Sequence, residues 1–167
     1  LYEEGEEPWR SIPAYLASQK KDWGKGTMPH LLPEHLRGIR EFALHTGTEI
    51  PEGGVGLALG FGDLPQEMEQ MAETFHLAHV HGVEWVNTKE EPRIEKAAKY
   101  LASRGHSPER FHLHHASIYD LRNALRDSSV DLVYGVRVGR WIGGESEAFP
   151  REVVRVLAPG GIAYILG

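Results

Sequence analysis

The chain has 167 residues and no cysteine, and its length is typical of one domain. The missing cysteines exclude a disulfide framework, a thiolate nucleophile and a cysteine-ligated zinc site. A formal net charge of −6 gives no overall electrostatic support for nucleic-acid binding, and no apolar run approaches the roughly 18 residues of a membrane helix.

We expect residues 1–50 to form an N-terminal leader and a helical lid. The leader holds four glutamates in its first eight residues, and like charges at that density favour a solvated segment. Apolar residues at helical spacing predict a helix over residues 9–23. A second helix is predicted to begin at Pro33, because proline suits a first turn, and to end at Gly47. Residues 51–167 are expected to form the core that follows.

From residue 51 onward, predicted strands and helices alternate along the chain. Short apolar runs predict strands at 55–59, 78–85, 111–115, 130–134 and 162–166. Amphipathic spacing predicts helices at 65–75, 91–104, 121–126 and 147–157, and Pro159-Gly160-Gly161 predicts a turn. Alternation at this spacing favours βαβ units. We therefore predict an α/β fold with a doubly wound, mostly parallel sheet and N-terminal helices.

The first predicted strand runs into a glycine turn, Gly60-Phe61-Gly62-Asp63. Glycine lets the backbone pass close beneath a ligand because no Cβ intervenes, and the following helix N-terminus offers free N–H groups. The pattern indicates a ligand site. By itself it is also compatible with a tight packing turn.

The second predicted strand ends at Glu84, 24 residues beyond Gly60. An acidic residue about 20 residues after a glycine turn can accept hydrogen bonds from ribose hydroxyls. A solvated glutamate at a strand end is the simpler alternative. Together the glycine turn and Glu84 favour an adenosine-containing ligand.

Two further segments carry a family resemblance. They are Asp131-Leu132-Val133-Tyr134 and the run REVVRVLAPGG over residues 151–161. With the glycine turn and Glu84, this series resembles the class I S-adenosylmethionine-dependent methyltransferases from Val55 to Leu166. The resemblance implies a Rossmann-like methyltransferase fold, S-adenosyl-L-methionine as cofactor, and methyl transfer to a small-molecule or protein acceptor.

The resemblance also implies roles for particular residues. Gly60, Gly62 and Asp63 would flank the methionine part of the cofactor, Glu84 would hold the ribose, and Gly135 would lie beneath the sulfonium. Around the adenine we expect Trp85, Ser117 and Ile118, and Phe61 belongs to the same cofactor-binding set. No residue is assigned as a catalytic base. Candidates on the acceptor side are Arg137, Arg140 and Trp141, although core packing is the commoner role of a tryptophan.

The sequence departs from the family pattern at several points. Ala58 stands where the family often has an acidic residue, Leu64 replaces the third glycine, and the chain ends at the fifth strand. These departures keep open an inactive methyltransferase-like module, with the edge of the fifth strand open to a partner chain or missing segment. A nicotinamide-dependent oxidoreductase is a third alternative. We expect no membrane partner, regard nucleic acid as a poor match, and take a cytoplasmic location as the default.

Histidines are concentrated on the second and third strands. His79 and His81 share one face of the second strand, and His112 and His114 share one face of the third, because side chains alternate with a period of two. Neighbouring strands would bring these four imidazoles onto one surface. Imidazoles bind zinc, copper or nickel and titrate near neutrality. We assign no metal ligands and favour a pH-sensitive patch.

Overall fold

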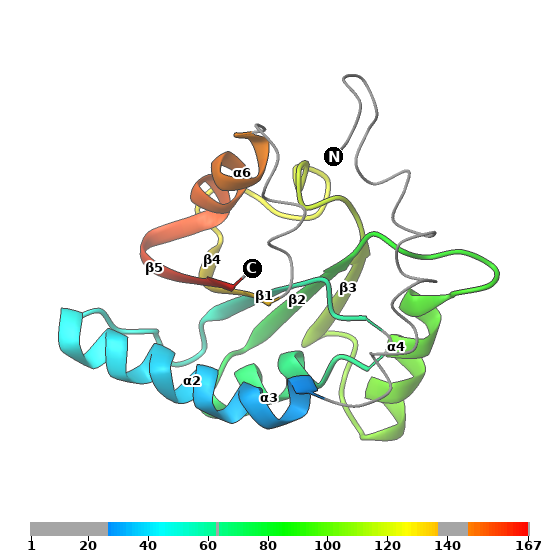
Figure 1. The fold of residues 1–167 in the computed structure, drawn as a ribbon, viewed down its shortest axis with the longest axis horizontal. Coiled ribbons are helices and arrows are strands. Elements are labelled where there is room, and N and C mark those ends of the chain that lie inside the picture. Colours follow the sequence, from blue (N-terminus) through cyan, green and yellow to red (C-terminus); the bar gives the residue numbers. More distant parts are fainter. Residues whose placement is uncertain (1–26, 63, 137–146, 167) are drawn as a thin grey trace.

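The computed structural model describes residues 27–62, 64–136 and 147–166 (Figure 1). The strands are β1 (Val55–Leu59), β2 (His79–Glu84), β3 (Phe111–His115), β4 (Val130–Val136) and β5 (Leu157–Leu166). The helices are α2 (Thr27–Thr46), α3 (Gln66–Phe75), α4 (Arg93–Ser103) and α6 (Ala148–Val156). None of these helices has the length and apolar character that crossing a membrane requires.

The five strands form one parallel sheet in the order β3-β2-β1-β4-β5. The chain moves outward from β1 to β3 and then returns to β4 on the other side of β1, which confirms the doubly wound prediction. Leu59 is paired with Val83 on one side and with Gly135 on the other. The carboxyl ends of β1, β2 and β4 therefore meet at one edge of the sheet.

Two layers of helices cover the sheet. Helices α2, α3 and α4 lie on one face and α6 on the other (Figure 1). Along β1 the buried side chains alternate: Ala58 packs with the α3 residues Met68 and Met71, whereas Leu57 packs with the α6 residue Phe149. This alternation is expected for a strand that is covered on both faces. The predicted inward stripe of α3 is confirmed, because Met68, Met71, Ala72 and Phe75 are all buried.

Helix α2 is longer than predicted. It begins at Thr27, and Pro33 lies inside it rather than at its start. Proline removes one backbone N–H near the beginning of this helix, and the buried Leu36 and Ile39 hold the following turns against the core. The predicted stop is confirmed, because Gly47 adopts a left-handed φ of 66° directly after the helix. The helix predicted over 9–23 lies outside the described residues.

Two predictions near the end of the chain were wrong. Residues 121–126 form hydrogen-bonded turns and not a helix, since a segment this short gains too few internal hydrogen bonds. Strand β5 begins at Leu157 rather than at Ile162 and carries the predicted turn within it. Val130 pairs with Leu157 and Leu132 pairs with Ile162, so the intervening residues of β5 form a bulge.

The family-like segments at the end of the chain have structural roles. Asp131 at the start of β4 accepts a hydrogen bond from the Val55 amide at 2.9 Å, which fixes β1 against β4. Arg155 in α6 pairs with Glu152 at 2.9 Å and with Asp127 at 2.8 Å. The Glu152 carboxylate also accepts the Leu121 amide at 2.6 Å. These contacts join α6 to the turns between β3 and β4.

Candidate functional site

The glycine turn forms a bend at the carboxyl end of β1. Gly60 and Gly62 have φ values of 70° and 67°, a left-handed conformation that favours glycine. The Gly60 amide donates to the Val83 carbonyl at 2.8 Å, which ties the bend to β2. Apart from its chain neighbours, no atom of the residues that the structure describes lies within 4 Å of the position that a Cβ on Gly62 would take. Asp63 lies outside the described residues.

Phe61 contributes its backbone to the bend and its ring to the core. The side chain is only 3% exposed and packs among core residues. A Cβ placed on Gly82 of β2 would lie 2.7 Å from the Phe61 ring, so the ring lies directly over that strand. The ring therefore fixes the bend from below.

Glu84 lies beside the bend and is only 5% exposed. Its Oε2 accepts the Gly62 amide at 2.9 Å, and its Oε1 accepts the Val86 amide at 3.0 Å. Nη1 of Arg93 lies 3.3 Å from the same Oε2. A carboxylate has about four lone-pair positions, so three of them are engaged within the chain. The remaining position is on Oε1.

Arg93 was not singled out by the sequence analysis. It is the first residue of α4, and its buried guanidinium pairs with both Glu84 and Glu91 at 3.3 Å. The loop before α4 is also ordered by the Asn87 side chain, which accepts the Ile94 amide at 3.2 Å. A helix start favours acidic side chains, so the helix itself gives no reason to expect Arg93 there, and no sequence signal places it against the end of β2.

The remaining predicted cofactor residues lie at the ends of neighbouring strands. The Trp85 ring contacts His115, with centroids 5.7 Å apart, and its carbonyl accepts from the His115 Nε2 at 2.8 Å. Ser117 Oγ accepts the Tyr119 amide at 3.1 Å, so this hydroxyl has a local partner. Ile118 packs against the α6-side core. Gly135 is buried within β4, opposite Leu59. The candidate acceptor-side residues Arg137, Arg140 and Trp141 lie outside the described residues.

A second polar group lies between α2, α3 and β4, on the sheet face that these two helices cover. The Tyr134 hydroxyl lies 3.0 Å from the His35 Nδ1, and the Tyr134 ring stacks on Tyr164 at 6.0 Å. Burial raises the pKa of Glu67 to about 8, a backbone hydrogen bond opposes this shift, and the Glu84 charge adds to it. Burial and then the Glu67 charge also raise the pKa of Tyr134. Both groups are therefore neutral near pH 7.

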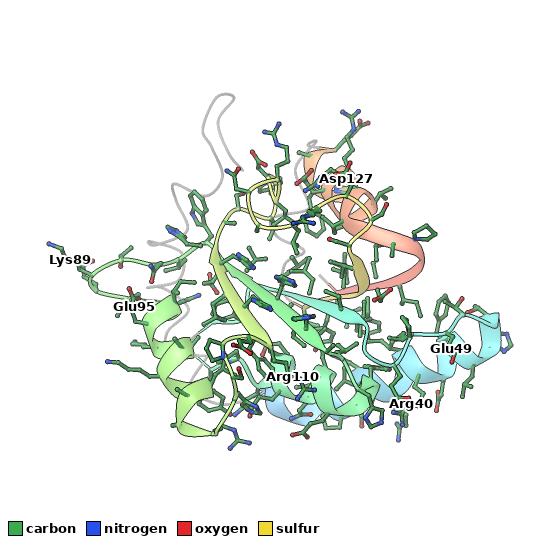
Figure 2. All side chains as sticks on the ribbon, turned by 180° about the vertical axis from the view of Figure 1, so that it is seen from behind. Arg40, Glu49, Lys89, Glu95, Arg110 and Asp127 are labelled. Atoms are coloured by element: carbon green, nitrogen blue, oxygen red, sulfur yellow. The ribbon has the colours of Figure 1, made fainter. Side chains whose placement is uncertain are left out.

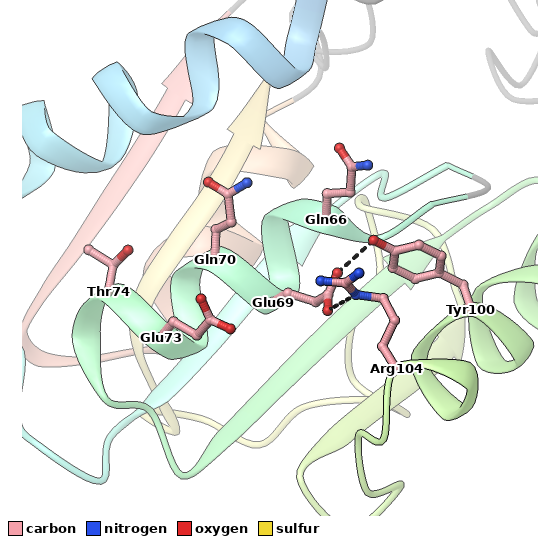
Figure 3. Close-up of a pocket in the computed structure, with 7 residues that line it drawn as sticks. All are labelled: Gln66, Glu69, Gln70, Glu73, Thr74, Tyr100 and Arg104. Carbon is pink, nitrogen blue, oxygen red and sulfur yellow. Dashed lines mark hydrogen bonds and ion pairs between the residues drawn. The ribbon is translucent and has the colours of Figure 1, made fainter.

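A groove of about 400 Å³ lies elsewhere, between α3 and α4 (Figure 3). Its floor is the buried Glu69, which accepts from the Tyr100 hydroxyl at 2.7 Å and also pairs with Arg104 and His106. Burial alone would raise the pKa of Glu69, but the hydrogen bonds from Arg104, Tyr100 and His106 lower it overall. The Glu69 carboxylate interacts with Tyr100, Arg104 and His106 of the same chain. We therefore interpret the groove as a structural contact that holds α3 against the α4 region, a clamp between the two helices, and not as the cofactor site.

The four strand histidines do meet, as predicted. Nδ1 of His79 lies 3.1 Å from Nε2 of His112, and Nδ1 of His81 lies 2.9 Å from Nε2 of His114. Burial, and then the neighbouring imidazoles, lower the pKa of His81 to about 4, and the pKa of His114 is also lowered. Among the described residues, no group of three or more histidine, aspartate or glutamate side chains is arranged to hold a metal ion.

Comparison with known proteins decides the family. A family model for the methyltransferase domain matches residues 57–165, which is more than half of the chain. The chain belongs to the methyltransferase domain family. It is a class I S-adenosylmethionine-dependent methyltransferase domain, and S-adenosyl-L-methionine is the cofactor of that family. The resemblance stated from the sequence is thereby confirmed. No curated protein sequence matches the chain.

Solved structures share the fold at low sequence identity. A candidate S-adenosyl-L-methionine-dependent methyltransferase from Methanococcus maripaludis has 15% identity and a TM-score of 0.61, over 100% of this chain and 68% of its own. A complex of a Haloferax volcanii methyltransferase activator with a candidate methyltransferase has 16% identity and a TM-score of 0.63, over 95% of this chain and 59% of its own. A Thiobacillus denitrificans methyltransferase with bound S-adenosyl-L-homocysteine has 21% identity and a TM-score of 0.54, over 80% of this chain and 47% of its own.

These comparisons bear on the alternatives. The chain spans about half to two thirds of the length of these solved proteins, and at this identity the likeness shows the fold alone. The family match favours a methyltransferase over a nicotinamide-dependent oxidoreductase. Nothing in the comparisons supports the inactive module.

Proposed function

We propose that the chain transfers a methyl group from S-adenosyl-L-methionine to a small-molecule or protein acceptor. The observation that carries this proposal is the pairing of a glycine bend with a carboxylate. Gly62 donates to Glu84 at 2.9 Å, and among the described residues other than its chain neighbours no atom lies within 4 Å of the position that a Cβ on Gly62 would take. An adenosyl ligand needs both features, a backbone without Cβ atoms and an acceptor for its ribose.

The cofactor residues are divided among four strand ends. Gly60, Phe61 and Gly62 supply the bend, and Glu84 accepts from the ribose at its remaining Oε1 position. A second ribose hydroxyl would share Glu84 with the Gly62 amide or displace it. Trp85, Ser117 and Ile118 border the adenine, and Gly135 leaves room beneath the reacting methyl group, all as proposals from the family pattern.

When bound, the cofactor supplies a methyl group already activated on a sulfonium. Gly60, Gly62 and Glu84 would hold this cofactor, which would supply the methyl group to a lone pair of the acceptor. The chain then has to hold the two reactants in line and exclude water, which is the catalytic contribution of proximity and orientation. No described side chain is assigned as the base. The net charge of −6 favours a small molecule or a protein over nucleic acid as acceptor.

Calorimetric titration with S-adenosylhomocysteine tests the proposal. We expect saturable binding by the wild-type chain and at least about tenfold weaker binding by Glu84→Gln, which keeps the shape but loses the charge. Glu95→Gln is the matched control, because Glu95 is exposed on the outer side of α4 (Figure 2). A folded wild-type chain that does not bind at millimolar ligand would overturn the proposal.

A protein partner at the outer edge of β5 is a second part of the proposal. In the described part of the chain β5 pairs only with β4, and a strand edge with open N–H and C=O groups can receive another strand. A solved structure with this fold is a complex of a methyltransferase with a protein activator, which is consistent with a protein partner. Light scattering tests for self-association, and a concentration-independent monomer that turns over methyl donor without a partner contradicts this part.

A further inference from the structure

The four strand histidines form one continuous column along β2 and β3. His112 lies between the two histidines of β2: its ring centroid is 5.3 Å from that of His79 and 4.7 Å from that of His81. The column continues from His81 to His114 at 5.2 Å, with the two rings within 18° of parallel. His79 is exposed and the other three rings are partly buried, so solvent reaches the column from one end.

The strand register produces this column. His81 is directly paired with His112 in the parallel ladder, and Val83 is paired with His114. The apolar side chains Val80, Phe111 and Leu113 of the same strands face α4 and its core, so all four histidines face the opposite side. Nothing in the proposed methyl transfer uses them.

The paired histidines are joined by hydrogen bonds, and their nitrogen separations are also close to those of metal chelates. Nitrogen ligands lie about 2.0–2.1 Å from a late divalent metal, so two neighbouring ligands of a square-planar ion are about 2.8–3.0 Å apart. A tetrahedral ion separates them by about 3.3–3.4 Å. The two pairs measure 3.1 Å and 2.9 Å, closer to the square-planar value. To bind an ion, the proton within each pair would move to the far nitrogen of its ring, and both rings would rotate so that the two lone pairs point at the ion. His79 Nδ1 would also give up its contact with the Glu109 carbonyl at 3.2 Å.

We propose that the histidine column binds Cu²⁺ or Ni²⁺, one ion at the His79–His112 pair and one at the His81–His114 pair. These ions prefer imidazole ligands in square-planar geometry, and the remaining positions of each ion are completed by water. The absence of three converging ligands in the described residues sets this site apart from a closed structural zinc site. Each bound ion links β2 to β3 at the end of the sheet.

The test is equilibrium dialysis of the whole chain against NiCl2 and CuCl2, with ZnCl2 for comparison. We expect two ions per wild-type chain, and one ion for His112→Asn and for His114→Asn. His45→Asn is the control, since His45 is exposed in the last turn of α2 and apart from the column. It should bind two ions. Electron paramagnetic resonance of the copper form should show coupling to two nitrogens per ion.

Circular dichroism establishes that each variant is folded. His79→Asn is the substitution least disturbing to the core, because this ring is exposed, and it should also remove one ion. Bound Ni²⁺ should raise the unfolding temperature of the wild type and not that of a His79→Asn, His114→Asn double variant. Wild-type stoichiometry in the column variants, or equal losses in His45→Asn, overturns the proposal. So does a wild-type chain that binds no Ni²⁺ below millimolar concentration.

Discussion

Arg93 and Glu84 form a buried ion pair, with Nη1 and Oε2 3.3 Å apart, at the point where β2 leads into α4. Both side chains are at most 7% exposed, so the surrounding protein screens their charges little. The pair places a cation against the carboxylate that we propose for ribose binding. The orientation of Glu84 therefore depends on a residue of the next helix.

Arg93→Met should weaken the binding of ligands that carry a ribose diol. Removal of Arg93 leaves Glu84 without its cation and less firmly oriented, and we expect about tenfold weaker binding of methylthioadenosine, or about 1.4 kcal/mol. The 2′,3′-dideoxy analogue has no diol, so the substitution should not change its affinity. Calorimetry with both ligands measures the difference.

A purely structural role of Arg93 would give equal losses for the two ligands. Loss of one member of a buried pair can cost about 3–5 kcal/mol of stability, so Arg93→Lys serves as the conservative variant. It retains the charge and should recover part of the affinity for methylthioadenosine.

Glu67 should make the protein less stable as the pH rises. Its pKa is raised to about 8 in the folded chain, against an ordinary value of 4.5, so the folded state holds a proton that the unfolded state has lost. Stability should then fall between about pH 4.5 and pH 8, the range between the two pKa values. Glu67→Gln mimics the protonated side chain and should remove this decline. Urea denaturation at pH 5 and pH 8.5 measures it, and parallel pH profiles for the two proteins would contradict the assignment.

Gly82→Ala should destabilise the fold. A Cβ at this position would lie 2.5 Å from the Met68 sulfur and 2.7 Å from the Phe61 ring, so the core beneath the glycine bend would have to shift. Overpacking of this kind costs about 1–3 kcal/mol. Gly38→Ala is the matched control, because nothing lies within 4 Å of its Cβ position and alanine favours the helix by about 1 kcal/mol. The unfolding temperature should fall for Gly82→Ala and rise for Gly38→Ala. An unchanged unfolding temperature for Gly82→Ala would contradict the packing described.

Glu69→Gln should weaken the clamp between α3 and α4 without affecting cofactor binding. The change removes the charge that Arg104 and His106 contact, and hydrogen bonds to a charged group contribute about 1.5–3 kcal/mol. Arg104 is 54% exposed, so the lower end of this range is expected. Glu73→Gln, an exposed position on the same helix, should have little effect. A loss of S-adenosylhomocysteine affinity in Glu69→Gln, with stability unchanged, would contradict the structural role.

The sequence was sufficient to predict most of the sheet. The bounds of β1 and β3 agree with the predicted strands, because each is a short run of strand-forming residues bounded by turns. The predicted helix at 121–126 was wrong because a few residues of suitable spacing cannot outweigh the cost of starting a helix. The start of α2 was missed because proline is usually read as a boundary, whereas Pro33 lies in the second turn of the helix, where it removes one internal hydrogen bond.

The site was less accessible to sequence reasoning than the fold. Gly62 and Glu84 were chosen by spacing, and the structure brings them into hydrogen-bond contact. Arg93 and Glu67 were missed because both depend on contacts with residues on other elements. The side-chain direction of Phe61 was also inaccessible, since it depends on the space left by Gly82. Whether the proposed cofactor residues contact the ligand stays a prediction.

The bulge of β5 has a consequence for insertions and deletions. Four residues, 158–161, stand opposite the single residue Asp131 before pairing resumes at Ile162. Successive side chains of a strand point to opposite faces, so the parity of this spacer determines which way Ile162 and Tyr164 point. Deletion of one residue there would turn Tyr164 away from His35 and Tyr134. Deletion of two residues would keep Tyr164 on the same face of the sheet.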